Sequence, residues 1–256
     1  MRDLTRRLAP AVAALALLAH SAAFGDTIVA PNANAGTSGS GQQYGVLGSG
    51  AVTFQFAYDA SQLSGISSGS TIDGIGFRLP ARADTFPTTL SYSQFSIDVA
   101  TAALPVGSLS TTFASNVSAD DTVVRSGALS IPGGSFVGGS NPNPFFEIVF
   151  TTPFVYQGGA LVVTIRHSAP GQDGPPVDAN TIPTPLPLTI GNSVANFGSA
   201  TETTGQAGYF DVPITSFYFT PSGGAVPEPA SVVSSGTAVV MMVLGFAWRH
   251  RRRDAA

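Results

Sequence analysis

Few residues of this chain could carry out chemistry. Its 256 residues include no cysteine and no lysine, which excludes disulfides, thiolate nucleophiles and thiolate metal sites. In the stretch 26–225 the only histidine is His167, so a Ser-His-Asp triad would have to use it. Serines and aspartates are abundant throughout this stretch, and their presence discriminates nothing. We therefore expect His167 to be a surface or core histidine at a strand end, and we expect the protein not to be an enzyme.

Oxygen ligands for a metal ion gather in two predicted loops. Neither loop has the D-x-D-x-D spacing of a calcium loop, and one histidine cannot make a zinc site. We therefore expect solvated turn residues in both loops, and we predict neither a metal nor a cofactor. The residues are Asp173, Asp178 and Asn180 in one loop and Asn116, Asp120 and Asp121 in the other.

Sugar chemistry would need paired carboxylates or exposed aromatic rings. Glu147 and Glu202 are the only glutamates well inside 26–225, and neither has a recognisable context for glycoside hydrolysis. The stretch contains no tryptophan, so stacking on a sugar ring would fall to tyrosines, which more often pack half-buried in a β-sandwich. The candidates are Tyr44, Tyr92, Tyr156 and Tyr209.

Charge is sparse and negative in 26–225. The stretch contains four arginines and twelve acidic residues, which is a net charge of −8. Nucleic acid requires a basic stripe that neutralises its phosphates, so it is excluded as a partner of this stretch. An anionic membrane surface is disfavoured as a partner for the same reason. Arg78 and Arg82 lie near Asp84 in the sequence, and an exposed ion pair there would contribute about 0–1 kcal/mol.

Residues 1–25 have the composition of a secretory signal peptide. Three arginines precede an apolar run at 8–19, and small residues follow that run. Cleavage after Ala23 or after Gly25 would both suit signal peptidase, because both positions offer small side chains. We therefore predict export by the secretion machinery, with 26–225 as the ectodomain.

The C-terminal end predicts a transmembrane helix at 230–248. These nineteen residues carry no charge, and a helix of that length is about 28 Å long, close to the hydrocarbon thickness of a bilayer. The basic tail 249–256 follows at once, and the positive-inside rule keeps its arginines in the cytoplasm. The basic cluster comprises Arg249, Arg251, Arg252 and Arg253.

The tetrapeptide Val226-Pro227-Glu228-Pro229 stands directly before this helix. Each proline fixes φ and removes an amide donor, so the segment is extended and stiff. Tetrapeptide, helix and arginine cluster, residues 226–256, together resemble a PEP-CTERM sorting signal. The resemblance implies recognition by an exosortase, which is a membrane-embedded cysteine protease-transferase. It also implies cleavage near the motif, in bacteria with two-membrane envelopes that make exopolysaccharide.

Between the two ends, the hydrophobic pattern has a period of two residues. Glycine- and proline-rich turn signals separate the alternating runs, and no run favours a long helix. We expect eight to ten strands in an all-β ectodomain, an antiparallel β-sandwich of jelly-roll-like topology. The alternation is clearest at 52–58, 75–79, 95–99, 146–150, 161–166 and 217–219.

Three segments of the ectodomain have more specific interpretations. The apolar runs on either side of Gly158 and Gly159 predict a central hairpin. The low-complexity segment 31–50 contains two Gly-Ser-Gly triplets, which are interpreted as linker because no lysine and no helix follow them. The segment 168–187 contains six prolines and predicts an extended loop or edge cover instead of a strand.

These features favour a non-enzymatic exported protein of the cell surface or extracellular matrix. Its partners would be the secretion machinery, signal peptidase and an exosortase-type membrane protease. It would pass through a single-pass inner-membrane intermediate with a cytoplasmic C-terminus and then reach the surface or the medium. The alternative is an exopolysaccharide-binding module at the cell surface, and a hydrolase ranks third.

Overall fold

The computed structural model describes residues 25–181, 190–207 and 211–223. The predicted signal peptide, apart from Gly25, lies outside the described residues, as do Tyr209 and the whole sorting signal at 226–256. No helix within the described ranges is long and apolar enough to cross a membrane.

The regular structure of the described residues consists of fifteen strands and four short 3-10 helices. The strands are β1 (Asp26–Ala30), β2 (Gly41–Gln43), β3 (Val52–Tyr58), β4 (Thr71–Phe77), β5 (Leu90–Tyr92), β6 (Phe95–Thr101), β7 (Thr122–Arg125), β8 (Leu129–Ile131), β9 (Phe146–Val155), β10 (Leu161–His167), β11 (Val177–Thr181), β12 (Gly191–Phe197), β13 (Gln206–Ala207), β14 (Asp211–Pro213) and β15 (Thr215–Thr220). The 3-10 helices are η1 (Asn32–Asn34), η2 (Ala60–Leu63), η3 (Val106–Ser108) and η4 (Phe113–Asn116).

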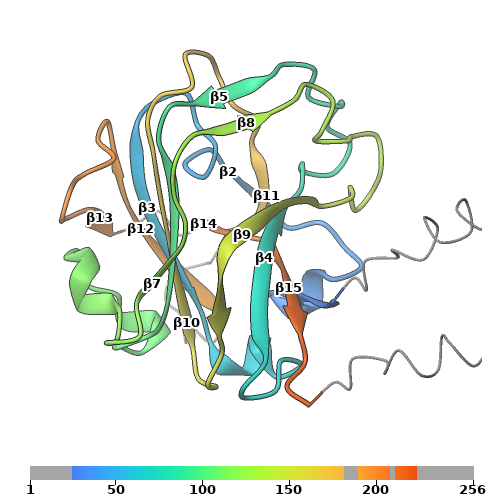
Figure 1. Cartoon of the computed structure of the whole chain (residues 1–256). Helices are drawn as coiled ribbons and strands as arrows, with labels where there is room; N and C mark the ends of the chain where they lie inside the picture. The colour runs from blue at the N-terminus through green and yellow to red at the C-terminus, as the bar shows by residue number, and fades with distance from the viewer. Residues whose placement is uncertain (1–24, 182–189, 208–210, 224–256) are drawn as a thin grey trace, which may run out of the picture. The chain divides into compact units, whose positions relative to one another are not determined.

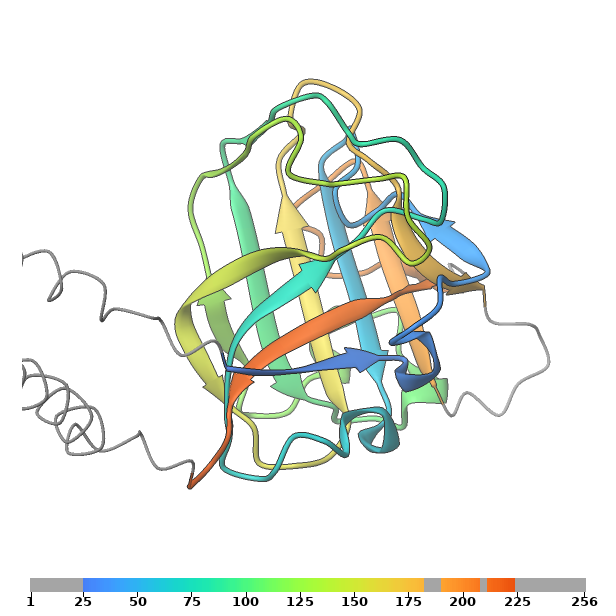
Figure 2. The same ribbon diagram turned by 90° about the vertical axis from the view of Figure 1, so that its right-hand side faces the viewer.

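Two antiparallel sheets pack face to face, as Figures 1 and 2 show. The four-stranded sheet has the order β1-β15-β4-β9, and the six-stranded sheet has the order β13-β12-β3-β10-β6-β7. Aromatic side chains join the two sheets, because Phe56 packs edge-on against Phe77 at 6.3 Å and Tyr58 against Phe217 at 5.7 Å. The prediction of an all-β fold with a β-sandwich-like core is therefore confirmed.

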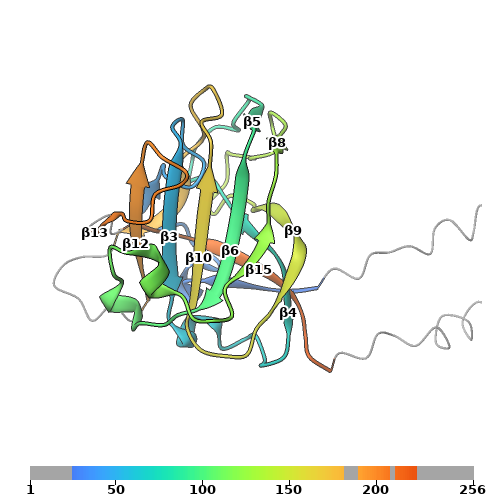
Figure 3. The ribbon, with the colours of Figure 1, turned by 60° about the vertical axis from the view of Figure 1, so that its left-hand side comes forward.

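Strand β3 is buried on both of its faces. Its alternating Phe54, Phe56 and Tyr58 side chains belong to the main core. Ala57, on the opposite face, belongs to a second small core with Val106, Leu109, Phe113, Val162 and Val194. The segment that carries η3 and η4 thus covers part of the outer face of the six-stranded sheet, whose central strands are seen side by side in Figure 3.

Three expectations about strands are wrong. Strands β9 and β10 form no hairpin, because β9 pairs with β4 in one sheet and β10 pairs with β3 and β6 in the other. The proline-rich segment contains a strand, β11, and the low-complexity segment contains β2, which pairs with it. Fifteen described strands exceed the expected number, because strands of two to five residues are too short to show alternation.

The small sheet β14-β11-β2 is attached to the sandwich through a buried ion pair. Arg78, directly after β4, is 1% exposed, and its Nε donates to Oδ2 of Asp178 on β11 at 2.9 Å. Its Nη2 donates to the carbonyls of Asn34 and Thr37, at 3.0 and 2.7 Å. The other carboxylate oxygen of Asp178 accepts from the Gly39 N–H at 3.0 Å.

The predicted pairing of Arg78 or Arg82 with Asp84 is therefore wrong. Arg82 and Asp84 are both exposed, whereas Arg78 forms its ion pair with a residue one hundred positions away. The guanidinium also lies 4.8 Å from the ring centre of Phe145, within the range of a cation–π contact. The two opposite charges thus compensate each other inside the protein, as burial of charge requires.

We expect Asp178→Ala to lower the free energy of unfolding by about 3–5 kcal/mol, because it leaves a guanidinium buried without its counter-charge. Urea unfolding, monitored by far-UV circular dichroism, measures this loss. Asp84→Ala is the matched control, since Asp84 is exposed, and we expect a change within about 0.5 kcal/mol. Equal losses for the two variants would contradict the central role of the buried pair.

Candidate functional site

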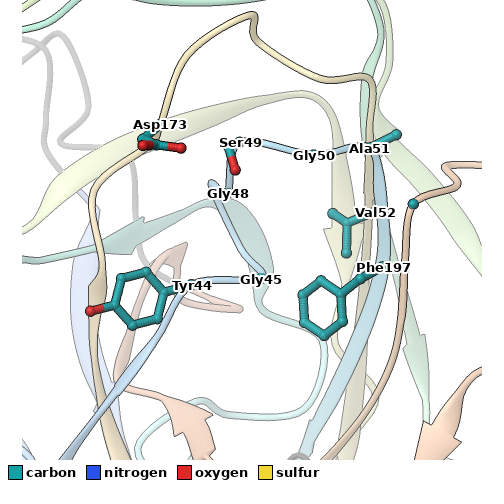
Figure 4. A pocket seen from close by; sticks show the side chains of 11 residues that line it. Tyr44, Gly45, Gly48, Ser49, Gly50, Ala51, Val52, Asp173 and Phe197 are labelled. Carbon is teal, nitrogen blue, oxygen red and sulfur yellow. The ribbon is translucent and has the colours of Figure 1, made fainter.

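A surface pocket of about 540 Å³ lies beside the start of β3. We call it the Tyr44 pocket. The loop between β2 and β3 forms most of its wall, and the end of β12 and the turn before β11 complete it (Figure 4). Its lining residues are Tyr44, Gly45, Gly48, Ser49, Gly50, Ala51, Val52, Asp173, Gly174, Phe197 and Gly198.

Two aromatic rings of the pocket are open to solvent. Tyr44 is 59% exposed and Phe197 is 48% exposed, and Figure 4 shows their rings on either side of Gly45. The Tyr44 hydroxyl donates to Oε1 of Gln42 at 3.2 Å, which orients the ring. Exposed rings that flank an open pocket are the surfaces on which sugar rings and other flat apolar faces stack.

The loop that carries Tyr44 is anchored to the main core. Val46 and Leu47 are fully buried in the main core. The Gly45 N–H donates to Oε1 of Gln43 at 2.7 Å, and the Tyr92 hydroxyl donates to the Leu47 carbonyl at 3.1 Å. These anchors pre-form the pocket wall, so a ligand would not have to order it.

Glycines let the backbone approach closely at this site. A Cβ on Gly174 would lie 1.6 Å from the Leu47 carbonyl oxygen, and a Cβ on Gly45 would lie 3.0 Å from the Phe197 ring. Gly50 differs, because its Cβ would meet nothing within 4 Å. Residues 48–50, interpreted from sequence as linker, belong to the loop that connects β2 to β3, and they line the pocket.

The imidazole of His167 lies in the core under this loop and not on the surface. Its ring stacks on Phe95 with centroids 5.8 Å apart and packs edge-on against Tyr92 at 4.8 Å. Nδ1 lies 2.9 Å from the Ser168 carbonyl oxygen. Burial lowers the pKa of His167, against the opposing effect of the backbone of Ser168, Gly45 and Val46. The geometry is that of a packed core histidine, which decides between the surface and core positions that the sequence left open.

A serine in the spacing of a nucleophile elbow, which the sequence analysis missed, occurs at Gly65-Ile66-Ser67-Ser68-Gly69. This segment lies in the turn between η2 and β4. An elbow requires a strand before the serine and a helix after it, and here a 3-10 helix precedes and a strand follows. The match is therefore one of spacing only.

The structure disperses the oxygen side chains of the two predicted loops. Within the described residues, no group of three or more acidic or histidine side chains could hold an ion. Asp178 and Asn180 lie on β11 and not in a loop, and Nδ2 of Asn180 donates to Oδ1 of Asn34. Asn116 is buried and donates to Gln55 at 2.6 Å, and Asp120 accepts from the Thr101 N–H at 3.0 Å. Of the six residues, Asp173 borders the Tyr44 pocket and Asp121 borders a second depression.

Asp121 lines a second, polar depression on the outer face of the six-stranded sheet, of about 200 Å³. Arg166 crosses this face and forms an ion pair with Asp98. Burial raises the pKa of Asp98 and of Asp121, while the Arg166 charge opposes this rise. Glu202 borders the same depression, whereas Glu147 lies on β9 in the other sheet. The two glutamates are therefore not brought together as a glycosidase pair.

The four candidate tyrosines have different surroundings. Tyr92 and Tyr156 are buried, Tyr209 lies outside the described residues, and Tyr44 is exposed in the pocket. Phe197 is a site residue that sequence reasoning missed. The sequence cue that could have found it is a large aromatic residue directly before a glycine. Phe197 is the last residue of β12, and Gly198 has a φ of 110°.

Comparisons with known proteins found no relative of this chain. No protein-family model, no curated protein and no solved structure matches the chain.

We expect His167→Phe to change the dependence of stability on pH. Because the pKa of His167 is lowered in the folded protein, wild-type stability falls as pH drops below the ordinary value of about 6.5. The variant lacks this loss. Its free energy of unfolding relative to that of wild type therefore rises as the pH falls from ~7.5 to ~5.5. Urea unfolding of both proteins at the two pH values measures the difference. A difference in the free energy of unfolding that is the same at both pH values would contradict the prediction, because it would show that His167 takes up no proton on unfolding.

Proposed function

We propose that this chain is a non-enzymatic exported protein, sorted to the cell surface or extracellular matrix through its C-terminal segment. The observation that carries the proposal is the succession of Val226-Pro227-Glu228-Pro229, nineteen uncharged residues and a cluster of arginines. The uncharged run is long enough to span a bilayer as a helix, and the arginines oppose its translocation. An exosortase-type membrane protease would then recognise the extended tetrapeptide.

The ectodomain would be a jelly roll with additional strands. In support, eight strands in chain order, β1, β3, β4, β6, β7, β9, β10 and β15, fall into the sheets β1-β15-β4-β9 and β3-β10-β6-β7. This is the interleaved order that two Greek keys produce in a double sheet. Strands β12 and β13 extend the second sheet beyond β3.

Sorting predicts a shortened mature protein. In the native host we expect the intact mass of the mature chain to lack residues 230–256, and replacing Pro227, Glu228 and Pro229 together with alanine should leave the full-length form in the membrane. Ala225→Ser is the matched control just outside the motif and should be processed normally. Mature wild-type chains that all retain 230–256 would overturn processing and leave a single-pass anchor.

A glycan-binding role is the second candidate function, and the Tyr44 pocket favours it. The pocket combines two solvent-exposed rings, a pre-formed wall and a rim with the Ser49 hydroxyl and the Asp173 carboxylate. Aromatic faces pack on the C–H face of a sugar ring, and a hydroxyl and a carboxylate exchange hydrogen bonds with sugar hydroxyls. An exported protein in an exopolysaccharide matrix would meet such ligands.

We expect the full chain, purified in a sugar-free detergent, to bind oligosaccharides on a glycan array. Tyr44→Ala should weaken this binding about tenfold, because one stacking face is lost. Val149→Ala is the control, since Val149 is an equally exposed apolar residue on β9, outside the pocket. An array without any bound glycan would remove this second function and leave the sorting proposal intact.

A further inference from the structure

We propose that the Tyr44 pocket selects uncharged glycans and excludes those that carry carboxylate or sulfate groups. The inference rests on the proposed glycan-binding role and names the class of ligand for it. It follows from the charges of the lining residues, from the surroundings of the four ectodomain arginines and from the polar groups on the rim.

Among the described residues that line the pocket, no side chain is cationic. The carboxylate of Asp173 is the one charged group among them. Proteins that recognise carboxylates or sulfates use charge-assisted hydrogen bonds, above all the two parallel N–H donors of an arginine. An acidic sugar in this pocket would instead meet a negative charge without compensation.

None of the four ectodomain arginines lines the pocket. Arg78 is buried with Asp178, and Arg166 is paired with Asp98 on the outer face of the six-stranded sheet. Arg125 donates to the carbonyls of Val149 and Ala128, near β9. Arg82 is exposed, its backbone N–H donates to the Ser140 carbonyl, and it is not among the residues that line the pocket.

The charge of the whole ectodomain acts in the same direction. Twelve acidic residues and four arginines leave a net charge of −8 in 26–225. At physiological ionic strength this field extends about 8 Å from the surface, which is enough to repel a polyanionic chain that approaches the pocket. An uncharged chain does not feel this repulsion.

The rim suits an uncharged sugar for a positive reason as well. A carboxylate accepts hydrogen bonds and donates none, so Asp173 fits hydroxyl groups, which can donate. Figure 4 shows Asp173 and Ser49 at one end of the pocket and the two rings at the other. A sugar ring stacked on Tyr44 or Phe197 would therefore turn its hydroxyl edge towards this rim. The volume of about 540 Å³ lies within the range of pockets for small ligands.

The test compares uncharged and acidic oligosaccharides of equal length. Maltohexaose, cellohexaose and mannohexaose serve as uncharged probes, and hexamers of galacturonic acid and of mannuronic acid serve as acidic ones. Calorimetric titration of the full chain, in a sugar-free zwitterionic detergent, measures each affinity. We expect at least one uncharged hexamer to bind at least about tenfold more tightly than both acidic ones, with less than about twofold change between low and high salt.

Gly50→Trp locates the binding site without removing a contact. Its side chain would enter open space in the pocket, so we expect it to abolish binding of the uncharged hexamer while the circular dichroism spectrum stays that of wild type. Gly36→Trp is the matched control, because Gly36 is also exposed with nothing within 4 Å of its Cβ, and it lies outside the pocket. We expect its affinity to equal that of wild type.

Three outcomes would overturn the inference, and they are distinguishable. Acidic hexamers that bind more tightly than uncharged ones, with loss of binding in Gly50→Trp, would overturn the ligand class and leave the glycan-binding role standing. Uncharged hexamers that bind Gly50→Trp as well as wild type would overturn the assignment to this pocket. Failure of every hexamer to bind would overturn both the inference and the glycan-binding role.

Discussion

The buried pair of Arg78 and Asp178 is the interaction on which the architecture around the pocket depends. A charge without a partner cannot be kept in a β-sandwich core, so the two residues require each other. Their remaining donors and acceptors bind the backbone of Asn34, Thr37 and Gly39. One ion pair therefore fastens the end of β4, the strand β11 and the low-complexity segment together.

The fixed geometry of the Tyr44 pocket follows from this attachment. Strand β2 pairs with β11 at Val177 to Ala179, and the loop that carries Tyr44 begins directly after β2. The loop is then anchored again by Val46 and Leu47 in the core. A glycine-rich segment that would be a flexible linker by itself is thereby held at both ends, and its aromatic ring remains exposed. Pre-organisation of this kind reduces the entropy that a ligand would otherwise cost.

The sparse charges of the ectodomain are used mainly for internal structure. The ion pairs of the described residues are Arg78–Asp178 and Arg166–Asp98, and both involve side chains that are buried or largely so. Polar side chains without charge form the other buried network, in which Asn116 donates to Gln55 and Gln55 donates to Thr164. The ectodomain has a net charge of −8, and no arginine is among the described residues that line the pocket.

The all-β class and most of the long strands could be predicted from sequence, because the alternation of large apolar residues in β3, β6 and β10 is local and marks the face that belongs to the main core. The succession at 226–256 is likewise local, so its interpretation as a sorting signal needs no tertiary information. The partners of Arg78 and the surroundings of His167 could not be predicted, since residues far apart in sequence supply them. The pocket also required the fold, because its two rings, Tyr44 and Phe197, are separated by more than half of the chain and meet only when β12 pairs with β3. Local periodicity thus determined which segments are strands, whereas long-range pairing of strands and of buried charges decided which side chains share a site.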